Sequence, residues 1–327
     1  MKIGTIEIDK ALCLAPMEDV SDTPFRRICK EQGADLVYTE FANCEAIVRN
    51  VRQTMEKIQV HDGERPVAIQ LYGSGEESLE QAAGIAQAAG ADFIDINCGC
   101  WVKKIACRGD GAGLLRDLNK FQAVVESVMR GTDLPVTVKT RLGWDESSFA
   151  ILEVAPMLEA TGVQALTVHC RTRKQGYTGK ADWSWLPRIK EVSGIQLIAN
   201  GDIATPEDAR ACFDLGCDGV MIGRGAIHSP WIFRHMRHYL ETGEHLPEPA
   251  LDERIAMCIR HLTDSVAFRG ERRGVPAFRR HYAGYLKGVP NIANLRKDLM
   301  QFQEVAPIVA RLYRFLEEYN AGAEEAA

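Results

Sequence analysis

Short runs of apolar residues recur along the first two-thirds of the chain, and stretches with helical spacing separate them. Eight such runs predict strands at 12–17, 36–40, 67–73, 93–97, 136–141, 165–172, 196–200 and 219–223. A near-continuous apolar run such as 136–138 is typical of a parallel strand that is buried on both faces. Helical spacing fills the intervals, for example at 78–90 and 206–216. The second of these helices has Thr205 as its predicted N-cap and Pro206 at its first position.

Eight strand and helix pairs in this length are typical of a (β/α)8 barrel, whereas a doubly wound sheet more often has about five to seven. After a helical stretch at 231–240, residues 242–249 are rich in helix breakers, and no strand pattern follows. Helical spacing resumes at 251–268, 276–286 and 303–319. The sequence therefore predicts an α/β fold, a TIM barrel in residues 1–245. A small all-helical domain in 246–320 and a frayed tail at 321–327 follow it.

The ends of the predicted strands are unusually polar. In a barrel of this kind the chemistry lies at the carboxyl ends of the strands. Seven of the eight ends carry polar or small residues, namely Ala15, Pro16 and Met17, then Gln70, then Asn97, Cys98 and Cys100, then Lys139 and Arg141, then His169 and Arg171, then Asn200, Gly201 and Asp202, then Gly223 and Arg224. Such a convergence predicts a functional site, although any one of these residues could be structural.

Two of these ends predict a phosphate site. Backbone amides of small-residue loops after strands seven and eight commonly hold a phosphate. Gly201 and Gly223 permit close approach and Arg224 supplies charge, so we expect a phosphorylated cofactor or substrate. Lys139 beside that site would suit negative charge on a reduced flavin or an enolate.

The composition, 46% hydrophobic and 26% charged, excludes wholesale disorder, collagen and coiled coil. No run of about eighteen apolar residues appears, so we expect no membrane-spanning segment. The first nine residues lack the pattern of a secretory signal, which predicts a cytoplasmic protein. The ten cysteines are then expected to be reduced thiols rather than a disulfide framework.

The net charge of −6 conceals one basic stretch, residues 267–297, which we call the basic helical segment. It carries eight cations against the single acid Glu271, a net charge of +7. The cations are Arg269, Arg272, Arg273, Arg279, Arg280, Lys287, Arg296 and Lys297. This charge predicts a surface that contacts phosphate, and a solvated helix face is the alternative for part of these side chains.

Three cysteines near the fourth strand end have competing interpretations. Cys98, Cys100 and Cys107 could begin a zinc or iron–sulfur site, but a fourth ligand is missing and the C-x-C spacing does not give the usual knuckle, so we expect no metal. A thiol with a pKa of about 8.5 is mostly protonated at neutral pH and can donate a proton. Cys100, beyond the strand in a glycine-containing loop, suits that role better than Cys98, for which a small buried hydrophobe is an equal alternative.

Together these residues resemble a known family. The sequences APM at 15–17, DVSDTPFR at 19–26, QLYG at 70–73, DINCGC at 95–100, GDGAGLL at 109–115, KTRLG at 139–143, HCRT at 169–172, NGDI at 200–203 and MIGR at 221–224 are similar in order and spacing to the tRNA-dihydrouridine synthases, nearest the bacterial B-type branch. The basic helical segment, with FRRHY at 278–282 and YLKG at 285–288, is similar as well.

The resemblance implies an FMN enzyme that reduces the C5=C6 bond of selected uridines in tRNA, with NADPH recharging the flavin. It implies Cys100 as the proton donor to C5, while flavin N5 delivers hydride to C6. Asn97, Arg141 and Tyr177 match positions that contact the uracil. The positions that match the FMN site are Ala15, Pro16, Met17, Gln70, Lys139, His169, Asn200, Gly201, Asp202, Gly223 and Arg224.

One position departs from the family. The residue after the catalytic cysteine is usually proline, and this chain has Trp101. Proline fixes its own φ and restricts the residue before it, so its loss frees the loop that places Cys100. Trp101 either packs the loop down or stacks on a base.

Two other functions stay open from the sequence alone. A flavin barrel could reduce a small molecule, like a dihydroorotate dehydrogenase or an ene-reductase, and a barrel of this fold could bind RNA without catalysis. The basic helical segment favours RNA, because a small-molecule enzyme does not need it and because phosphate contacts would offset the cost of extruding a stacked uridine. Ribosomal RNA is an alternative to tRNA. We expect a monomer with no obligate protein partner.

Overall fold

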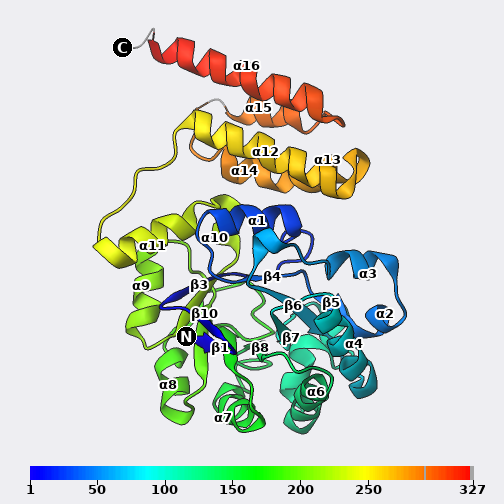
Figure 1. Cartoon of the computed structure of the whole chain (residues 1–327). Coiled ribbons are helices and arrows are strands. Elements are labelled where there is room, and N and C mark those ends of the chain that lie inside the picture. Colours follow the sequence, from blue (N-terminus) through cyan, green and yellow to red (C-terminus); the bar gives the residue numbers. More distant parts are fainter. Residues whose placement is uncertain (291, 325–327) are drawn as a thin grey trace.

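The computed structural model describes residues 1–290 and 292–324, and most of it is a barrel of parallel strands surrounded by helices (Figure 1). The barrel strands are β3 (Ala11–Leu14), β4 (Val37–Tyr38), β6 (Val67–Tyr72), β7 (Phe93–Asn97), β8 (Val136–Arg141), β9 (Ala165–His169), β10 (Gln196–Asn200) and β11 (Gly219–Ile222). Their order around the sheet is β3-β11-β10-β9-β8-β7-β6-β4, and a single bridge between Cys13 and Leu36 joins the two ends. The predicted barrel and all eight of its strands are confirmed.

Helices cover the outside of the barrel. They are α1 (Thr23–Glu31), α2 (Cys44–Val48), α3 (Arg52–Lys57), α4 (Glu76–Ala88), α5 (Lys103–Ala106), α6 (Leu118–Arg130), α7 (Ile151–Thr161), α8 (Trp185–Val192), α9 (Pro206–Asp214), α10 (Arg224–His228) and α11 (Ile232–Thr242). Two 3-10 helices, η1 (Asp62–Glu64) and η2 (Gly111–Arg116), lie in the connections. Thr205 caps α9 as predicted, and its side chain accepts a hydrogen bond from the Asp208 amide at 3.2 Å.

Three short strands fall outside the ring. β1 (Lys2–Ile3) and β2 (Ile6–Glu7) form a hairpin, and β5 (Ala42–Asn43) pairs with β6. Ile3 of the hairpin belongs to the apolar cluster inside the barrel. The hairpin therefore closes the amino end of the barrel, opposite the end where the polar residues lie.

Side-chain alternation along the strands places the polar residues inside the barrel. Successive residues of a strand point to opposite faces, so Phe93, Asp95 and Asn97 of β7 point the same way. Phe93 lies in the interior cluster with Tyr38 and Met221. The interior is therefore apolar near the amino end and becomes polar toward the carboxyl ends of the strands.

The chain after the barrel is helical. Its elements are α12 (Leu251–Arg269), α13 (Glu271–Phe278), η3 (Arg279–His281), α14 (Tyr282–Tyr285), α15 (Ile292–Leu299) and α16 (Val305–Glu324). These helices have an apolar core of their own, which Trp231, at the start of α11, joins. α16 continues to Glu324, into the stretch that the sequence predicts to fray, and residues 325–327 lie outside the described residues.

One helix prediction in this region was wrong, and one helix was not predicted. The helix expected at 276–286 is divided into α13, η3 and α14. Its first part begins five residues earlier than predicted, because Gly270, with φ of 76°, ends α12 and lets α13 start at Glu271. Gly274 lies so close to α12 that a Cβ would be 2.8 Å from the Cα of Val266. Helix α15 was not predicted, although its buried Leu295 and Leu299 have helical spacing.

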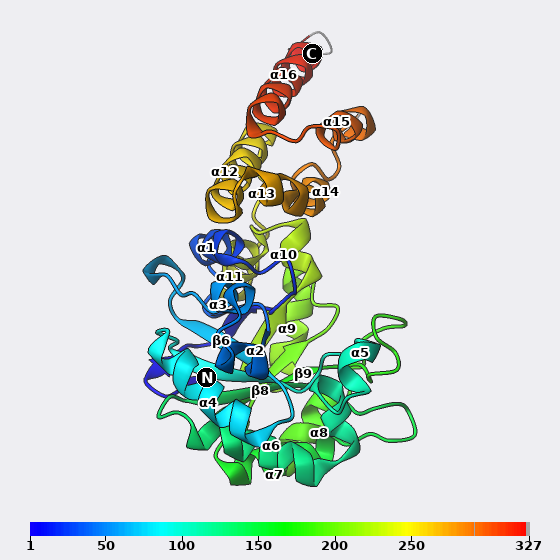
Figure 2. The same ribbon diagram turned by 90° about the vertical axis from the view of Figure 1, so that its right-hand side faces the viewer.

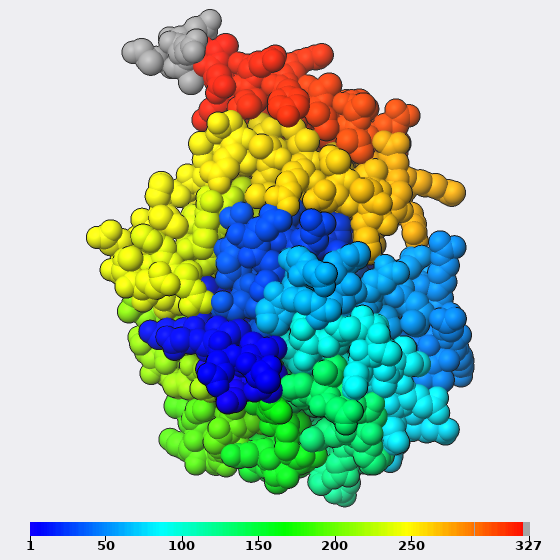
Figure 3. All heavy atoms as spheres, viewed as in Figure 1, coloured from blue at the N-terminus to red at the C-terminus, as the bar shows by residue number. Residues whose placement is uncertain are grey.

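The helical region packs on α1 of the barrel (Figure 3), where the blue surface of α1 meets the yellow and orange surface of the later helices. The ring of Phe25 lies 5.4 Å from that of His261 and 5.1 Å from that of His281. Arg260 of α12 forms an ion pair with Glu31 at 2.6 Å. Aromatic contacts and an ion pair thus join the two parts. Among the described residues, no helix has the length and apolar character to cross a membrane.

Candidate active site

A cavity of about 1330 Å³ opens at the carboxyl ends of the barrel strands. It brings together the residues that the sequence predicts for a cofactor, a substrate and a proton donor. Those that line it are Ala15, Pro16, Met17, Asn97, Cys100, Lys139, Arg141, His169, Tyr177, Asn200, Gly201, Asp202, Gly223 and Arg224. Gln70 is the exception, because it is fully buried beneath Asn97 and is not part of the cavity wall.

Cys100 lies in the loop that follows β7, half-buried at the cavity wall. The side-chain oxygen of Asn97 accepts hydrogen bonds from the amides of Gly99, at 3.2 Å, and Cys100, at 2.9 Å. Gly111, with φ of 55°, packs so tightly that a Cβ would lie 3.0 Å from the Cβ of Cys100. The thiol is therefore held in a defined place, and burial raises its pKa, which keeps it protonated at neutral pH.

The two neighbouring cysteines differ from Cys100. Cys98 is fully buried, and burial raises the pKa of its thiol. Cys107 is exposed at the end of α5. Among residues 1–290 and 292–324, no three cysteines come close enough to share a metal ion.

Behind Asn97, a chain of hydrogen bonds leads into the barrel. The Asn97 amide donates to the Gln70 side-chain oxygen at 2.9 Å, and the Gln70 amide donates to Asp95 at 2.6 Å. The Thr137 hydroxyl bonds the other oxygen of Asp95 at 2.6 Å. Burial raises the pKa of Asp95 to about 7. Asp95 and Gln70 thus support the loop of Cys100 without touching the cavity. No role was predicted for Asp95, since one acid between isoleucines is a weak signal.

Lys139 provides positive charge within the cavity. Its Nζ donates a hydrogen bond to Asn200 at 3.0 Å, and among the described residues no carboxylate forms an ion pair with it. Burial, and next the charge of Arg141, lower its pKa to about 8. Asn200 is fixed in turn, because its amide donates to the Met221 carbonyl at 2.7 Å. The ammonium group is therefore positioned and lacks a negative partner.

His169 lies beside these cations and remains neutral. Burial lowers its pKa well below the usual value, and the charges of Arg141 and Lys139 lower it further. Its Nδ1 is buried and has no hydrogen-bond partner among the described residues. A neutral imidazole with an unpaired nitrogen and an unpaired ammonium group together fit an anionic or polar ligand in this cavity.

Arg141 connects two loops of the cavity. Its Nε donates to the Gly99 carbonyl at 2.9 Å, and its Nη1 donates to the carbonyls of Thr172 and Gly176 at 3.1 and 3.0 Å. Burial is the main reason why its pKa is lowered, to about 10, so it stays charged at neutral pH. Arg141 thus joins the loop that carries Cys100 to the loop that carries Tyr177.

Asp202 neutralises part of the charge at the predicted phosphate loops. It accepts hydrogen bonds from Arg171 at 2.6 Å and from Arg224 at 2.9 Å. Arg171 is almost fully buried and also donates to the carbonyls of Thr178 and Gly179. Gly201 has φ of 112°, which disfavours a side chain at that position. Arg171 was predicted only to lie at a strand end, and the structure shows it to be an anchor of the 172–179 loop.

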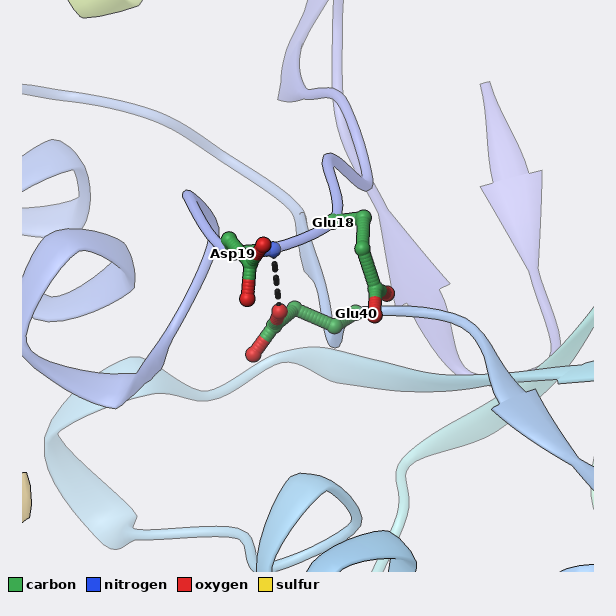
Figure 4. Close-up of side chains that lie close together, drawn as sticks. All are labelled: Glu18, Asp19 and Glu40. Carbon is green, nitrogen blue, oxygen red and sulfur yellow. Dashed lines mark hydrogen bonds between the residues drawn. The ribbon is translucent and has the colours of Figure 1, made fainter. Parts of the chain in front are cut away.

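Three carboxylates meet near the rim of the cavity (Figure 4). Glu18 and Asp19 are exposed, Glu40 is buried, and the amide of Asp19 donates to Glu40. Burial raises the pKa of Glu40. The cations Lys57 and Arg269 pair with this group, through Glu18 and Glu40 respectively. The cluster is therefore part of a network of ion pairs between the barrel and the helical region.

The cations of the basic helical segment fall into two groups. Arg269 and Arg279 are half-buried and bond within the protein, Arg269 to Asp22 at 2.8 Å and Arg279 to the Phe302 carbonyl at 3.2 Å. The other six are exposed, namely Arg272, Arg273, Arg280, Lys287, Arg296 and Lys297. Only part of the predicted basic surface is thus open to a ligand.

Comparisons with known proteins agree with this geometry. The family model described as dihydrouridine synthase matches residues 13–320. The tRNA-dihydrouridine synthase B of Pseudomonas aeruginosa is 38% identical to this chain over 100% of its length and 99% of the relative. A probable tRNA-dihydrouridine synthase of Synechocystis is 37% identical, over 93% of this chain and 86% of the relative.

Solved structures share the fold at lower identity. A variant of NCR from Zymomonas mobilis superposes with a TM-score of 0.52 at 19% identity, over 76% of this chain and 92% of the other. Morphinone reductase superposes with a TM-score of 0.54 at 15% identity, over 76% and 90%. These two likenesses support the barrel fold.

Proposed function

The chain belongs to the dihydrouridine synthase family, and from this premise we propose that it reduces the C5=C6 bond of selected uridines in tRNA to 5,6-dihydrouridine. The position of Cys100 supports this reaction most directly: a protonated thiol stands at the wall of a cavity that also holds unpaired positive charge. A reduction of a carbon–carbon double bond needs a hydride and a proton, and Cys100 is suited to give the proton.

FMN is the cofactor that we propose for this cavity, with NADPH as its reductant. Lys139 lacks a negative partner, and a ligand that carries negative charge would supply one. Asn200, His169 and the loops at Gly201 and Gly223 would hold the flavin with it, and Arg224 would face its phosphate. Gln70 does not line the cavity, so it would support the flavin site indirectly, through the hydrogen bond that it accepts from Asn97. Bound FMN would supply hydride to C6 of the uracil.

The protein side chains would orient the uracil and deliver the proton. Asn97 uses its oxygen and one of its N–H groups within the protein, which leaves one N–H for the substrate. Arg141 and Tyr177 border the same space. The Cys100 thiol would transfer its proton to C5, on a loop that Asn97 and Arg141 hold in place.

For the whole chain we propose a catalytic barrel in residues 1–245 and a tRNA-binding helical domain in residues 246–320. The exposed cations of the basic helical segment would contact tRNA phosphates. We propose further that the protein acts as a monomer in the cytoplasm, where its substrate is found.

Gene deletion in the source organism tests the reaction and the substrate together. We expect dihydrouridine to disappear from one or two tRNA positions, as quantified by mass spectrometry of digested tRNA, and to return with the wild-type gene. No change at any tRNA position would contradict the proposal and would direct the search to ribosomal RNA or to a small-molecule alkene. Purified protein that shows no flavin absorbance after FMN addition would contradict the cofactor.

The Cys100→Ala variant tests the proton donor. We expect turnover to fall by about 10²- to 10⁴-fold, the usual effect of losing a general acid, while FMN and tRNA still bind. Cys107→Ala is the matched control, because Cys107 is exposed on the same loop region and has no proposed part in the reaction. Equal rates for Cys100→Ala and wild type would assign the proton to another donor.

A further inference from the structure

Besides the basic helical segment, the protein has another basic region, which borders the cavity and consists of two loops that lie far apart in the sequence. Residues 101–108 carry three cations and residues 171–180 carry four, and neither loop contains an acid. We call these two loops the cavity-loop surface. Its net charge of +7 equals that of the basic helical segment. This surface was not predicted, because each loop alone looks ordinary and only the fold brings the loops together.

Most of this charge is accessible. Lys103, Lys104, Arg108, Lys174 and Lys180 are exposed. Arg173 lies over the ring of Trp144, at 4.5 Å, and the buried Arg171 is paired with Asp202. Lys104 and Arg108 line the cavity, so part of this exposed charge lies at its mouth, and Lys103, Lys174 and Lys180 lie on the same two loops.

Two aromatic side chains form the centre of the surface. Trp101 is 39% exposed and Tyr177 is 54% exposed, and both line the cavity. Their ring centroids lie 5.5 Å apart at an interplanar angle of 78°. The six-membered ring of Trp101 rests on Gly176, where an added Cβ would be 3.0 Å from it. Trp101 therefore packs its own loop onto the loop of Tyr177 and still offers indole surface to solvent.

The surface lies away from the helical region. Figure 2 shows α5, which follows Trp101, at the right-hand edge of the barrel at about the height of β9, whereas α13 and α14 lie above the barrel, over α10. Arg141 holds both loops, through its bonds to Gly99 and Gly176, so the surface is fixed relative to Cys100. A long substrate that enters the cavity could thus contact cations on both sides of it.

We propose that the cavity-loop surface binds the single-stranded nucleotides that flank the target uridine, with one base stacked on Trp101 and phosphates at Lys103, Lys104 and Lys174. Aromatic side chains beside a positive groove are the usual means of holding unpaired nucleotides without reading their sequence. A target base that leaves its stack exposes its neighbours, which this platform would receive. The assignment rests on the proposed function, because it presumes that RNA enters the cavity.

Tryptophan fluorescence tests the stacking without any need for catalysis. The flavin-loaded protein is titrated with tRNA from a strain that lacks this gene, and separately with a nine-nucleotide oligouridylate. We expect RNA to quench the emission of wild type more than that of Trp101→Phe, and the difference isolates one of the five tryptophans. Equal quenching of the two proteins would overturn the stacking of a base on Trp101.

Affinity measurements test how much Trp101 contributes to tRNA binding. Trp101→Ala should bind tRNA about 5- to 150-fold more weakly, the effect expected when one base loses its stacking partner, and Trp101→Phe should retain most of the affinity. Unchanged affinity of Trp101→Ala would overturn the proposal. If Trp101→Ala loses its flavin, the fluorescence comparison with Trp101→Phe decides the question.

The double variant Lys103→Gln/Lys104→Gln tests the binding of phosphates. We expect the slope of log affinity against log salt concentration to fall by roughly 0.7 for each phosphate that no longer has a lysine beside it. Lys10→Gln, at the opposite end of the barrel, is the control and should leave the slope unchanged. An unchanged slope in the double variant would overturn the binding of phosphates by these lysines. If wild type binds RNA in this way but forms no dihydrouridine, the surface stands and the proposed function fails.

Discussion

The cations within the cavity and those of the basic helical segment have the same sign but very different surroundings. Lys139 and Arg141 are largely enclosed, bonded to neutral oxygens, and their pKa values are lowered by burial. Arg272, Arg280 and Lys287 are exposed to solvent. Salt screens exposed charges far more than enclosed ones, whereas burial makes protonation sensitive to surroundings. The cavity should therefore respond to pH and little to salt, and the helical segment should show the opposite behaviour.

Removing exposed cations from the helical segment should have the largest effect on RNA binding. The variant with Arg272, Arg273, Arg280 and Lys287 all changed to Gln is expected to bind tRNA roughly 10²- to 10³-fold more weakly at about 0.1 M salt, with a salt slope smaller by about 3. FMN affinity should not change, because none of the four residues lines the cavity.

Matched charges on the outer barrel provide the control. Arg130 of α6 and Arg188 of α8 are exposed and lie outside both basic regions. Their change to Gln should leave the salt slope of wild type intact. If each outer charge reduced the slope as much as each charge of the helical segment, RNA would be held by overall charge and the comparison between regions would fail.

Replacing Lys139 should weaken FMN binding in a way that depends on pH and little on salt. Lys139→Met is expected to weaken FMN binding about 10- to 150-fold, the value of a hydrogen bond from a charged donor, with little dependence on salt. In the wild type, Lys139 is charged below its pKa of about 8 and loses the proton above it. FMN affinity should thus decrease as the pH rises through about 8, by up to about tenfold for each pH unit.

The pH profile of the variant tests whether Lys139 is the group whose deprotonation weakens FMN binding. Titration of flavin fluorescence between about pH 6 and pH 10 gives the affinity of both proteins. The variant should show a flat profile over the range in which the wild type declines. A decline of the same size in both proteins would assign the pH dependence to another group.

Much of the fold was accessible from the sequence, because its signals are local. The eight strands follow from short apolar runs, and the cap at Thr205 follows from its neighbours. The helices after the barrel were predicted less well. Gly270 turns the chain with its positive φ, and Gly274 lets α13 pack closely on α12; the spacing of apolar residues in α13 reveals neither.

The site residues that could be predicted from the sequence are those whose position follows from the alternation of side chains along one strand. Arg141, His169 and Asn200 end neighbouring strands, and register brings Arg141 beside His169 and His169 beside Asn200. Lys139 lies two residues before Arg141 and points to the same side of the sheet. Gln70 follows the same alternation but lies one layer deeper, so it supports the wall instead of lining it. The cavity-loop surface needed three-dimensional information, since more than sixty residues separate Trp101 from Tyr177.

Arg269 is an exception among the cations of the basic helical segment. It belongs to that segment by sequence, but in the structure it is largely enclosed, like Lys139 and Arg141. It is 20% exposed and bonds Asp22 at 2.8 Å, while Asp22 also caps α1 through the Phe25 amide. Arg269→Gln would leave Asp22 and Glu40 without their charged partner. We expect it to destabilise the protein by about 1–3 kcal/mol, the cost of a polar group left unpaired in a buried place, and to leave the salt slope of tRNA binding unchanged.

Thermal unfolding measures the destabilisation by Arg269→Gln, and tRNA binding at several salt concentrations measures the slope. Asp22→Asn is the matched variant, and the double variant with Arg269→Gln should be less destabilised than the sum of the two, because the pair is broken only once. A salt slope that falls as much for Arg269→Gln as for Arg272→Gln would mean that Arg269 leaves Asp22 to bind RNA. The burial of a cation in the structure would then not indicate whether it contacts RNA.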